Sequence, residues 1–260
     1  MQQTSDIYFP LRDSIGSVQL VGATADPTLS IVNAARVSYD TEKVEANERD
    51  KGLVGFLWKN HHTSPFRHAF YTLKVKMPLF VARQWWKHQV GCRWTMFVLP
   101  DGTETEIDVA SIQADIDNGC SWNEVSGRYV KLEPEFYVPK EFRGNAAHGN
   151  KQQSHELGWT AAEHEEMSQE YRDACDDAYL RYTDMLERGV AREQARMLLP
   201  QSIYTSVVWT VSVQSLLHFL ELRLKEDSQY EIRMYAEAIR DILKDDLLAM
   251  GVPGTALEGI

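Results

Sequence analysis

Residues 121–129, with the sequence SWNEVSGRY, carry side chains that can bind a phosphate group. The guanidinium of Arg128 can contact two phosphate oxygens at once, and a serine hydroxyl with adjacent backbone N–H groups can complete a cradle. Gly127 lets the backbone come close to a ligand because it has no side chain. The segment is therefore a candidate site for a nucleotide phosphate. A solvated turn is the alternative interpretation, since polar runs with glycine are common in turns.

Arg192 and Arg196 are a second candidate anion site. They stand four residues apart in a short helix predicted over 191–199, so they share one face. They would bind an anion if this face lined a cleft, and would be ordinary surface arginines if it did not. Further basic residues lie near these and other polar segments: Arg83, Lys87, Arg93, Lys131 and Arg223.

Metal binding and cysteine chemistry are not indicated. Three histidines fall within eight residues, His61, His62 and His68, but they lack the spacing of a helical ligand pair and no cysteine or paired carboxylate joins them. The cysteines are odd in number and form no CxxC pair: Cys92, Cys120 and Cys175. This usage suits a reducing compartment and buried or incidental thiols.

Composition limits the class of protein. The chain has 260 residues, 43% of them hydrophobic, which is enough for a sizeable core. Its net charge of -11 argues against binding nucleic acid or an anionic membrane through a broad basic face, but a small anionic ligand needs only a few local arginines. No signal peptide or membrane-length apolar stretch is recognisable, so we expect a cytoplasmic protein.

The hydrophobic pattern predicts one α+β domain without internal repeats. Strands are expected over 18–21, 69–76 and 203–212, and a hairpin from 93–99 and 105–109 around the turn at 100–103. Helices are expected over 30–39, 52–60, 79–88, 162–188, 191–199, 213–223 and 229–247. In the long helix, apolar residues at helical spacing predict a core stripe: Met167, Tyr171, Cys175, Tyr179, Tyr182 and Met185.

Several fragments, taken together, resemble flavin-dependent thymidylate synthases in order and spacing. They are ARVSY (35–39), HTSPFRH (62–68), PLFVARQWWKHQ (78–89), SWNEVSGRY (121–129), ARMLLP (195–200), the YT and WTVS pieces around Tyr204 and Thr210, and LHFLELR (217–223). The resemblance extends from about residue 18 to about residue 245.

This resemblance implies a homotetramer of α+β subunits, each a single domain with a mixed sheet and long helices, with FAD and dUMP bound where subunits meet. Such enzymes transfer a methylene group from 5,10-methylenetetrahydrofolate to C5 of dUMP and reduce it to methyl with electrons from NADPH carried by FAD. They are not thought to need a cysteine nucleophile. The absence of a convincing Cys/His pair in this sequence is consistent with that chemistry.

The resemblance also implies roles for individual residues. Arg223 would lie by the uracil edge, where a fixed cation can stabilise developing negative charge, and is the best catalytic candidate. Substrate contacts are implied for Gln84, Lys87, Glu124, Val125, Ser126, Gly127, Arg128, Arg196 and Arg223. Cofactor contacts are implied for Ser38, His62, Ser64, Lys87, His88, Gln89, Glu124, Ser212, Gln214 and His218, with Tyr129 near the flavin and folate.

The sequence departs from the family pattern mainly on the flavin side. Lys87-His88-Gln89 stands where the family has Arg-His-Arg, and residues 92–120 form an insertion before segment 121–129. The family's Asn, Arg and Asn positions are Ser212, Gln214 and His218, and a family Glu is Arg67. Two alternatives therefore stay open: a related enzyme that methylates UMP or hydroxymethylates a pyrimidine nucleotide, and a non-catalytic nucleotide-binding paralogue that has lost FAD.

Overall fold

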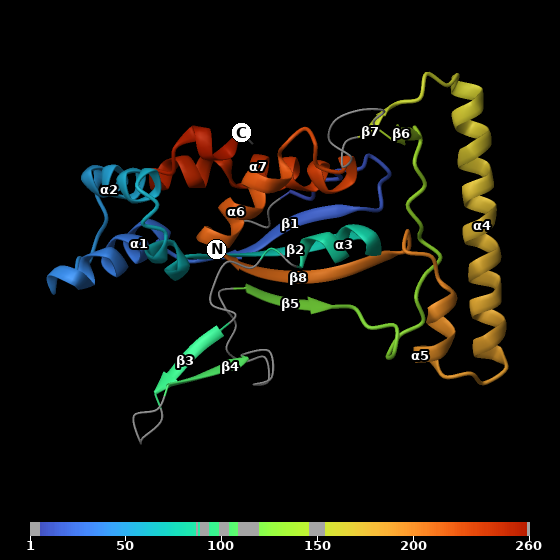
Figure 1. Ribbon diagram of the computed structural model, residues 1–260, viewed down its shortest axis with the longest axis horizontal. Coiled ribbons are helices and arrows are strands. Elements are labelled where there is room, and N and C mark those ends of the chain that lie inside the picture. The colour runs from blue at the N-terminus through green and yellow to red at the C-terminus, as the bar shows by residue number, and fades with distance from the viewer. Residues whose placement is uncertain are drawn as a thin grey trace.

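The structure is a computed structural model that describes residues 6–86, 88, 94–98, 104–108, 120–145 and 154–258. Its centre is a four-stranded sheet in the order β1-β2-β8-β5, formed by β1 (Ser17–Ala23), β2 (Phe70–Pro78), β8 (Tyr204–Ser212) and β5 (Cys120–Glu124). Figure 1 shows these strands side by side. Strands β2 and β8 pair over their whole length, from Phe70 opposite Ser212 to Pro78 opposite Tyr204.

The strands form because apolar and polar residues alternate along them, so one set of side chains enters the core. In β2, Tyr71, Leu73, Val75 and Met77 are buried, and the residues that alternate with them from Phe70 to Lys76 are more exposed. All three described pairs of this sheet are antiparallel, so the expected mixed sheet is wrong, although the α+β class is confirmed. The sequence pattern specified the strands but not their directions, which long-range pairing decides.

Helices cover one face of the sheet and extend from its ends (Figure 1). The helices and 3-10 turns are α1 (Pro27–Arg36), η1 (Val37–Tyr39), α2 (Glu48–Lys59), η2 (Ser64–His68), α3 (Leu79–Trp85), α4 (Ala161–Glu187), α5 (Arg192–Ala195), η3 (Arg196–Leu198), α6 (Val213–Arg223), α7 (Tyr230–Met250) and η4 (Gly254–Leu257). Two small ladders complete the described chain: β3 (Trp94–Val98) with β4 (Glu104–Asp108), the expected hairpin, and β6 (Arg143–Asn145) with β7 (Ser154–Glu156).

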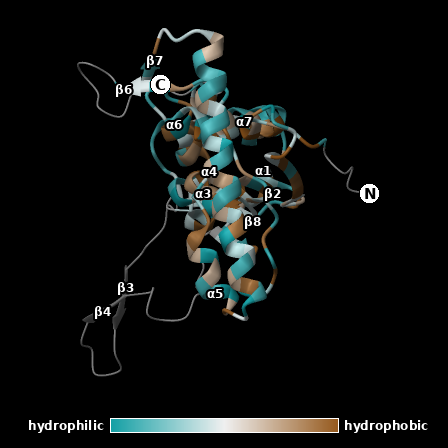
Figure 2. Ribbon diagram, turned by 90° about the vertical axis from the view of Figure 1, so that its right-hand side faces the viewer, coloured by the Kyte–Doolittle hydropathy of each residue, from teal (hydrophilic) through white to brown (hydrophobic). Residues whose placement is uncertain are grey.

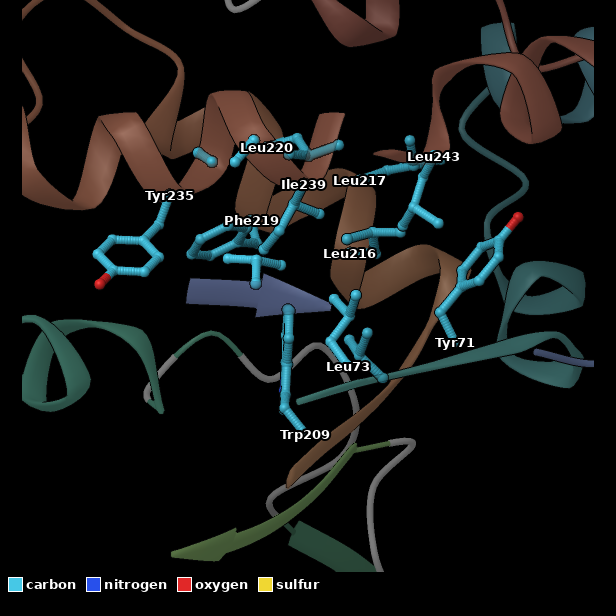
Figure 3. Packing of buried hydrophobic residues seen from close by; sticks show 14 of the residues in the cluster. Tyr71, Leu73, Trp209, Leu216, Leu217, Phe219, Leu220, Tyr235, Ile239 and Leu243 are labelled. Carbon is cyan, nitrogen blue, oxygen red and sulfur yellow. The ribbon is translucent and has the colours of Figure 1, made fainter. Parts of the chain in front are cut away.

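The core lies between the sheet and helices α6 and α7. Figure 3 shows leucine and isoleucine side chains of the two helices facing Leu73 and Trp209 of the strands. Trp85 of α3 stacks on Phe219 with ring centroids 4.7 Å apart and meets Trp209 edge-on at 5.2 Å. These aromatic contacts fix α3 against the core, and α3 carries Gln84 and its neighbours.

Helix α4 stands apart from this core along one side of the molecule, and Figure 2 shows it in front of the other elements. The predicted apolar stripe is only partly buried. Cys175 and Tyr182 are buried, but Tyr171 is 37% exposed. The helix is long because Thr160 and Glu163 form a capping box at its start and no proline or glycine interrupts it.

Local signals explain other differences between the expected and observed elements. Helix α2 begins at Glu48, four residues before the expected start, because Asn47 and Asp50 form a capping box. Helix α3 ends at Trp85, before the expected end at residue 88. Residues 120–124, for which the sequence predicted no strand, form β5 because they pair with β8. No helix in the described ranges is long and apolar enough to cross a membrane.

Candidate functional site

The candidate phosphate segment lines a cleft of about 920 Å³. Strand β5 extends its pairing through Val125 N, which donates to Ser206 O at 2.9 Å, and the chain then turns. Tyr129 N donates to Ser126 O at 3.0 Å, and Arg128 N donates to Ser126 Oγ at 3.3 Å. Polar and charged side chains on the cleft wall include Arg83, Glu124, Ser126, Arg196, Gln201 and Thr205.

Gly127 and Arg196 meet at this cleft. Gly127 is buried, and a Cβ atom on it would stand 3.2 Å from Cδ of Arg196 and 3.1 Å from Cδ1 of Leu132. The stem of Arg196 therefore packs on the turn, which brings together two of the predicted substrate residues from distant parts of the sequence. The exposed guanidinium of Arg196 has no carboxylate within ion-pair distance among the described residues.

Arg128 lies at the rim of the cleft and pairs with an acidic side chain. Its Nε is 3.5 Å from Oε2 of Glu193, and the two side chains are 56% and 58% exposed. Arg192 of the same short helix donates from Nη1 to Tyr129 O at 3.4 Å. An exposed ion pair contributes only about 0 to 1 kcal/mol, so a phosphate can replace Glu193 at little cost.

Glu124 has a fixed orientation in the cleft. Its Oε1 accepts a 2.8 Å hydrogen bond from Thr205 Oγ1, and its Oε2 accepts a 3.2 Å bond from Trp122 Nε1. The carboxylate can still accept from a hydroxyl or N–H group of a ligand. Thr205 and Arg83 were absent from the predicted site, because only the register of β8 and the packing of α3 bring them to this wall.

Gln84 and Arg223 line a second cleft, of about 500 Å³. Gln84 donates from Nε2 to Oε1 of Gln229 across it. Arg83 and Trp86, next to Gln84 on α3, line the first cleft instead. The structure thus brings Gln84 to Arg223 and Gly127 to Arg196, but it does not bring the two groups to one cleft of a single chain.

His88, expected on the cofactor side, is the hydrogen-bond partner of Arg223. Arg223 donates from Nε to Nε2 of His88 at 2.8 Å, so the imidazole is an acceptor there. Burial, together with the charges of Arg223 and His218, lowers the pKa of His88 to about 4. The pKa of Arg223 is also lowered, because the effect of burial is larger than the opposing effect of the negative charge of Asp227.

The remaining predicted cofactor residues gather around the start of α6. Gln214 donates to Thr63 Oγ1 at 2.8 Å and accepts from Arg67 Nε at 2.6 Å. Ser212 is the N-cap of α6 and accepts from Ser215 N at 3.2 Å. His218 lies one turn further along, with its ring 6.2 Å from that of His88.

The last predicted residues lie on exposed segments or outside the described chain. Ser38, His62 and Ser64 are exposed, and the ring of His62 meets Phe56 edge-on at 6.5 Å. The expected contacts of Lys87 and Gln89 fall outside the described residues. In the described ranges, no group of three or more His, Cys, Asp or Glu side chains could hold a metal ion.

Comparisons with known proteins identify the family. The family described as "Thymidylate synthase complementing protein" matches residues 19–99 and 116–247. A flavin-dependent thymidylate synthase of Thermus thermophilus is 39% identical over 239 residues, which cover 92% of this chain and 75% of the relative. The chain belongs to the flavin-dependent thymidylate synthase family. A flavin-dependent thymidylate synthase of Thermotoga neapolitana is 36% identical over 236 residues, covering 91% of this chain and 88% of the relative.

Solved structures agree with this assignment to the flavin-dependent thymidylate synthases. PolB of Streptomyces cacaoi, a UMP/dUMP methylase, was solved with 5-Br UMP and with 5-Br dUMP. Both structures are 26% identical to this chain and cover 91% of it, with TM-scores of 0.66 and 0.67, and the match covers 95% and 96% of the PolB chains. The predicted resemblance and flavin dependence are confirmed. The family match is interrupted at residues 100–115, inside the insertion expected over 92–120.

Proposed function

We propose that this chain converts dUMP to dTMP, with 5,10-methylenetetrahydrofolate as the carbon donor and NADPH as the reductant through FAD. The observation that carries the proposal is the meeting of Arg196 with the Gly127 turn at a cleft, because it combines a guanidinium with the donors of a phosphate-binding turn. Membership of the flavin-dependent thymidylate synthase family supports the same reaction.

In this proposal the first cleft binds the phosphate and sugar of dUMP. Arg196 and Arg128 contact phosphate oxygens, with Ser126 and the backbone of the turn completing the cradle. Glu124 accepts from a sugar hydroxyl, since Thr205 and Trp122 hold its carboxylate in place. The exposed ion pair between Arg128 and Glu193 opens when the phosphate binds.

Arg223 acts at the uracil ring. Its Nε donates to His88, and among the described residues no hydrogen bond engages its two Nη groups, which are available to the substrate. Gln84 lies in the same cleft as an amide donor and acceptor. A guanidinium fixed in this way would stabilise the N3-deprotonated, enolate-like form of the ring, whose negative charge makes C5 nucleophilic toward the one-carbon unit. The charge is met by a group that needs no reorientation, which is how a preorganised site lowers a barrier.

The residues near the start of α6 fit a flavin nucleotide. The hydrogen-bonded row of Thr63, Gln214 and Arg67 supplies a hydroxyl, an amide and a cation, and His218 follows one turn along α6. Ser38, His62, Ser64 and Ser212 complete the proposed cofactor side. Bound FAD carries the electrons of NADPH that reduce the transferred carbon. The protein's own part is to bind and orient it through these side chains.

We also propose that the site is completed between subunits of a homotetramer. In one chain, Arg196 lines one cleft, with Arg128 next to Gly127 in the turn beside it, and Gln84 and Arg223 line another. A nucleotide that contacts both groups therefore requires a second subunit. Co-expression of Arg128→Ala and Arg223→Ala chains tests this arrangement, because some mixed sites would have both arginines intact.

The co-expressed pair should recover about a quarter of the wild-type activity. Half of the chains retain Arg128 and the other half retain Arg223, so random assembly gives about one site in four both arginines. Arg128→Ala with Arg196→Ala is the matched control and should recover none, because both changes damage the same cleft of the same chain. If neither mixture recovers activity while all variants remain tetrameric, the shared site is wrong.

The reaction itself is tested by reconstitution. The purified chain is loaded with FAD and supplied with dUMP, 5,10-methylenetetrahydrofolate and NADPH, and the product is identified by mass. We expect a pyrimidine nucleotide with a methyl group at C5 and bleaching of the flavin absorbance by NADPH. A flavin-loaded tetramer that produces no C5-alkylated nucleotide would overturn the proposal.

A second substrate, UMP, is favoured by one specific observation: PolB was solved with both 5-Br UMP and 5-Br dUMP. UMP and dUMP should therefore compete in one assay, with both product masses recorded. Dominant methylation of UMP would assign the chain to the ribonucleotide, and a hydroxymethyl product would identify a different reduction step.

A further inference from the structure

We infer that Arg67 supplies the cation on the flavin side of the site and contacts a phosphate of the flavin nucleotide, with Gln214 as its positioning residue. The inference deepens the proposed function and rests on it. The family pattern that this sequence resembles implies an arginine at position 214 and a glutamate at position 67, whereas this chain has Gln214 and Arg67. The cation on this side of the site therefore comes from η2 and not from α6, where a neutral amide stands at position 214.

Arg67 and Gln214 are in direct contact through a hydrogen bond. Arg67 donates from Nε to Oε1 of Gln214 at 2.6 Å, although the residues are 147 positions apart. Gln214 is 7% exposed, and its Nε2 donates to Thr63 Oγ1 at 2.8 Å. Both ends of the amide are therefore engaged within the protein, so Gln214 orients the guanidinium and is not itself the main ligand.

The guanidinium remains available to an anion. Only its Nε has a hydrogen-bond partner in the described part of the chain, which leaves the two Nη groups and their four N–H donors. No ion pair joins Arg67 to a carboxylate there, although the sequence has 38 acidic residues. The two Nη groups match two oxygens of one phosphate group.

The backbone around Arg67 holds it in place. Pro65 and Phe66 of η2 are buried, and Phe66 meets Trp58 edge-on with centroids 5.5 Å apart. Helix η2 also packs against α1 and α6. Arg67 thus extends from an anchored turn, which lowers the entropy lost when its side chain binds a ligand.

Two of the backbone donors at the start of α6 are already used. Val213 N at the start of α6 donates to Ala69 O at 2.9 Å, and Ser215 N donates to Ser212 Oγ at 3.2 Å. A phosphate beside this helix would therefore depend mainly on side-chain donors. Because phosphates are the only strongly anionic groups of a flavin nucleotide, they are the part that Arg67 would contact.

The test measures FAD affinity by fluorescence titration of the flavin-free protein. Arg67→Gln should weaken FAD binding by about 10- to 100-fold, as expected for loss of a charge-assisted hydrogen bond. The loss should shrink at high salt, where the charge interaction is screened. Binding of dUMP should be unchanged.

A reciprocal exchange separates charge placement from structural damage. Arg67→Glu alone should bind FAD even more weakly, whereas Arg67→Glu combined with Gln214→Arg should recover most of the affinity by returning the cation to α6. Arg188→Gln is the matched control because it removes the same charge from the far end of α4, on the other side of the molecule from α1 and α2 (Figure 1). It should not change FAD affinity.

Failure of the role of Arg67 and failure of the proposed reaction give different results. If the wild type binds FAD and forms dTMP but Arg67→Gln binds FAD as tightly, with the same salt dependence, Arg67 is only a surface residue and the inference is wrong. If the wild type binds no FAD, the inference and the proposed function both fail. If the double variant binds FAD no more tightly than Arg67→Glu alone, a cation at position 214 does not replace the one at Arg67, and the inference is wrong.

Discussion

Arg223 at the end of α6 donates a 2.8 Å hydrogen bond from Nε to Nε2 of His88, 135 positions earlier in the chain. The bond requires an imidazole that is unprotonated at Nε2, and the lowered pKa of His88, about 4, maintains that state at neutral pH. A residue expected to contact the cofactor therefore supports the main catalytic candidate.

Acid should destabilise the fold through His88. Its pKa is about 4 in the folded chain and near the ordinary value of 6.5 when unfolded, so the unfolded chain binds more protons between these values. The free energy of unfolding should therefore decrease as the pH falls through this window, and His88 should have no such effect at higher pH. Urea titrations at fixed protein concentration measure the change.

His88→Gln is the comparison for this titration. Glutamine retains an acceptor for Arg223 but does not titrate, so the variant should lose part of the acid dependence and keep most of its turnover at neutral pH. His88→Leu should lower turnover because Arg223 loses its acceptor. Stability curves for the wild type and His88→Gln that run parallel from neutral to acidic pH would contradict this role.

Arg223 and Arg196 should affect different kinetic constants. Arg223→Ala should lower kcat more than it lowers FAD retention, because its guanidinium acts on charge that develops at the ring. Arg196→Ala should chiefly raise the Kd for dUMP, by about 10- to 100-fold for one lost charge-assisted contact. Steady-state kinetics and equilibrium nucleotide binding separate the two effects, and an Arg223→Ala enzyme with normal kcat would remove its assigned role.

Gly127→Ala should weaken nucleotide binding while the fold survives. The added Cβ would stand 3.2 Å from Cδ of Arg196 and 3.1 Å from Cδ1 of Leu132, closer than ordinary contact but against side-chain atoms that can shift. The main result should be a displaced Arg196 and a higher Kd for dUMP, with a loss of stability of about 1 kcal/mol. Calorimetry and a melting curve would check both.

Gly189→Ala provides the control for this glycine. A Cβ at Gly189 meets no atom within 4 Å, and its φ of +84° makes alanine strained there. It should therefore reduce stability without changing dUMP affinity. Equal dUMP affinity in the two variants would show that crowding at Arg196 is unimportant.

Trp85→Ala should lower the free energy of unfolding, because it removes the central ring of the aromatic core. Trp85 is fully buried and contacts Trp209, Phe219 and Tyr235, so its truncation should cost about 3 to 5 kcal/mol. Trp85→Phe should cost less, because the indole Nε1 has no hydrogen-bond partner among the described residues. Denaturant midpoints would rank the variants, and equal losses would contradict this explanation.

The sequence alone determined most elements and the chemistry of the donors. The residue patterns of 69–76 and 203–212 predicted the central strands β2 and β8, and the hairpin expected from 93–99 and 105–109 followed from the turn residues at 100–103. These patterns are local, because side-chain periodicity and turn preferences depend on residues a few positions apart. The residue types of Arg196, Arg223 and Gly127 likewise indicated an anion site before any geometry was available.

Only the tertiary structure decided which of these residues are neighbours. The antiparallel directions of the sheet, the packing of Arg196 on Gly127 and the separation of Arg223 into another cleft all depend on contacts between distant segments. The same is true of Arg67 and Gln214, which stand in the sequence as two separate departures from the family pattern but form one hydrogen bond in the structure. Hydrogen bonds and packing act through space, so the spacing of residues along a chain does not specify them.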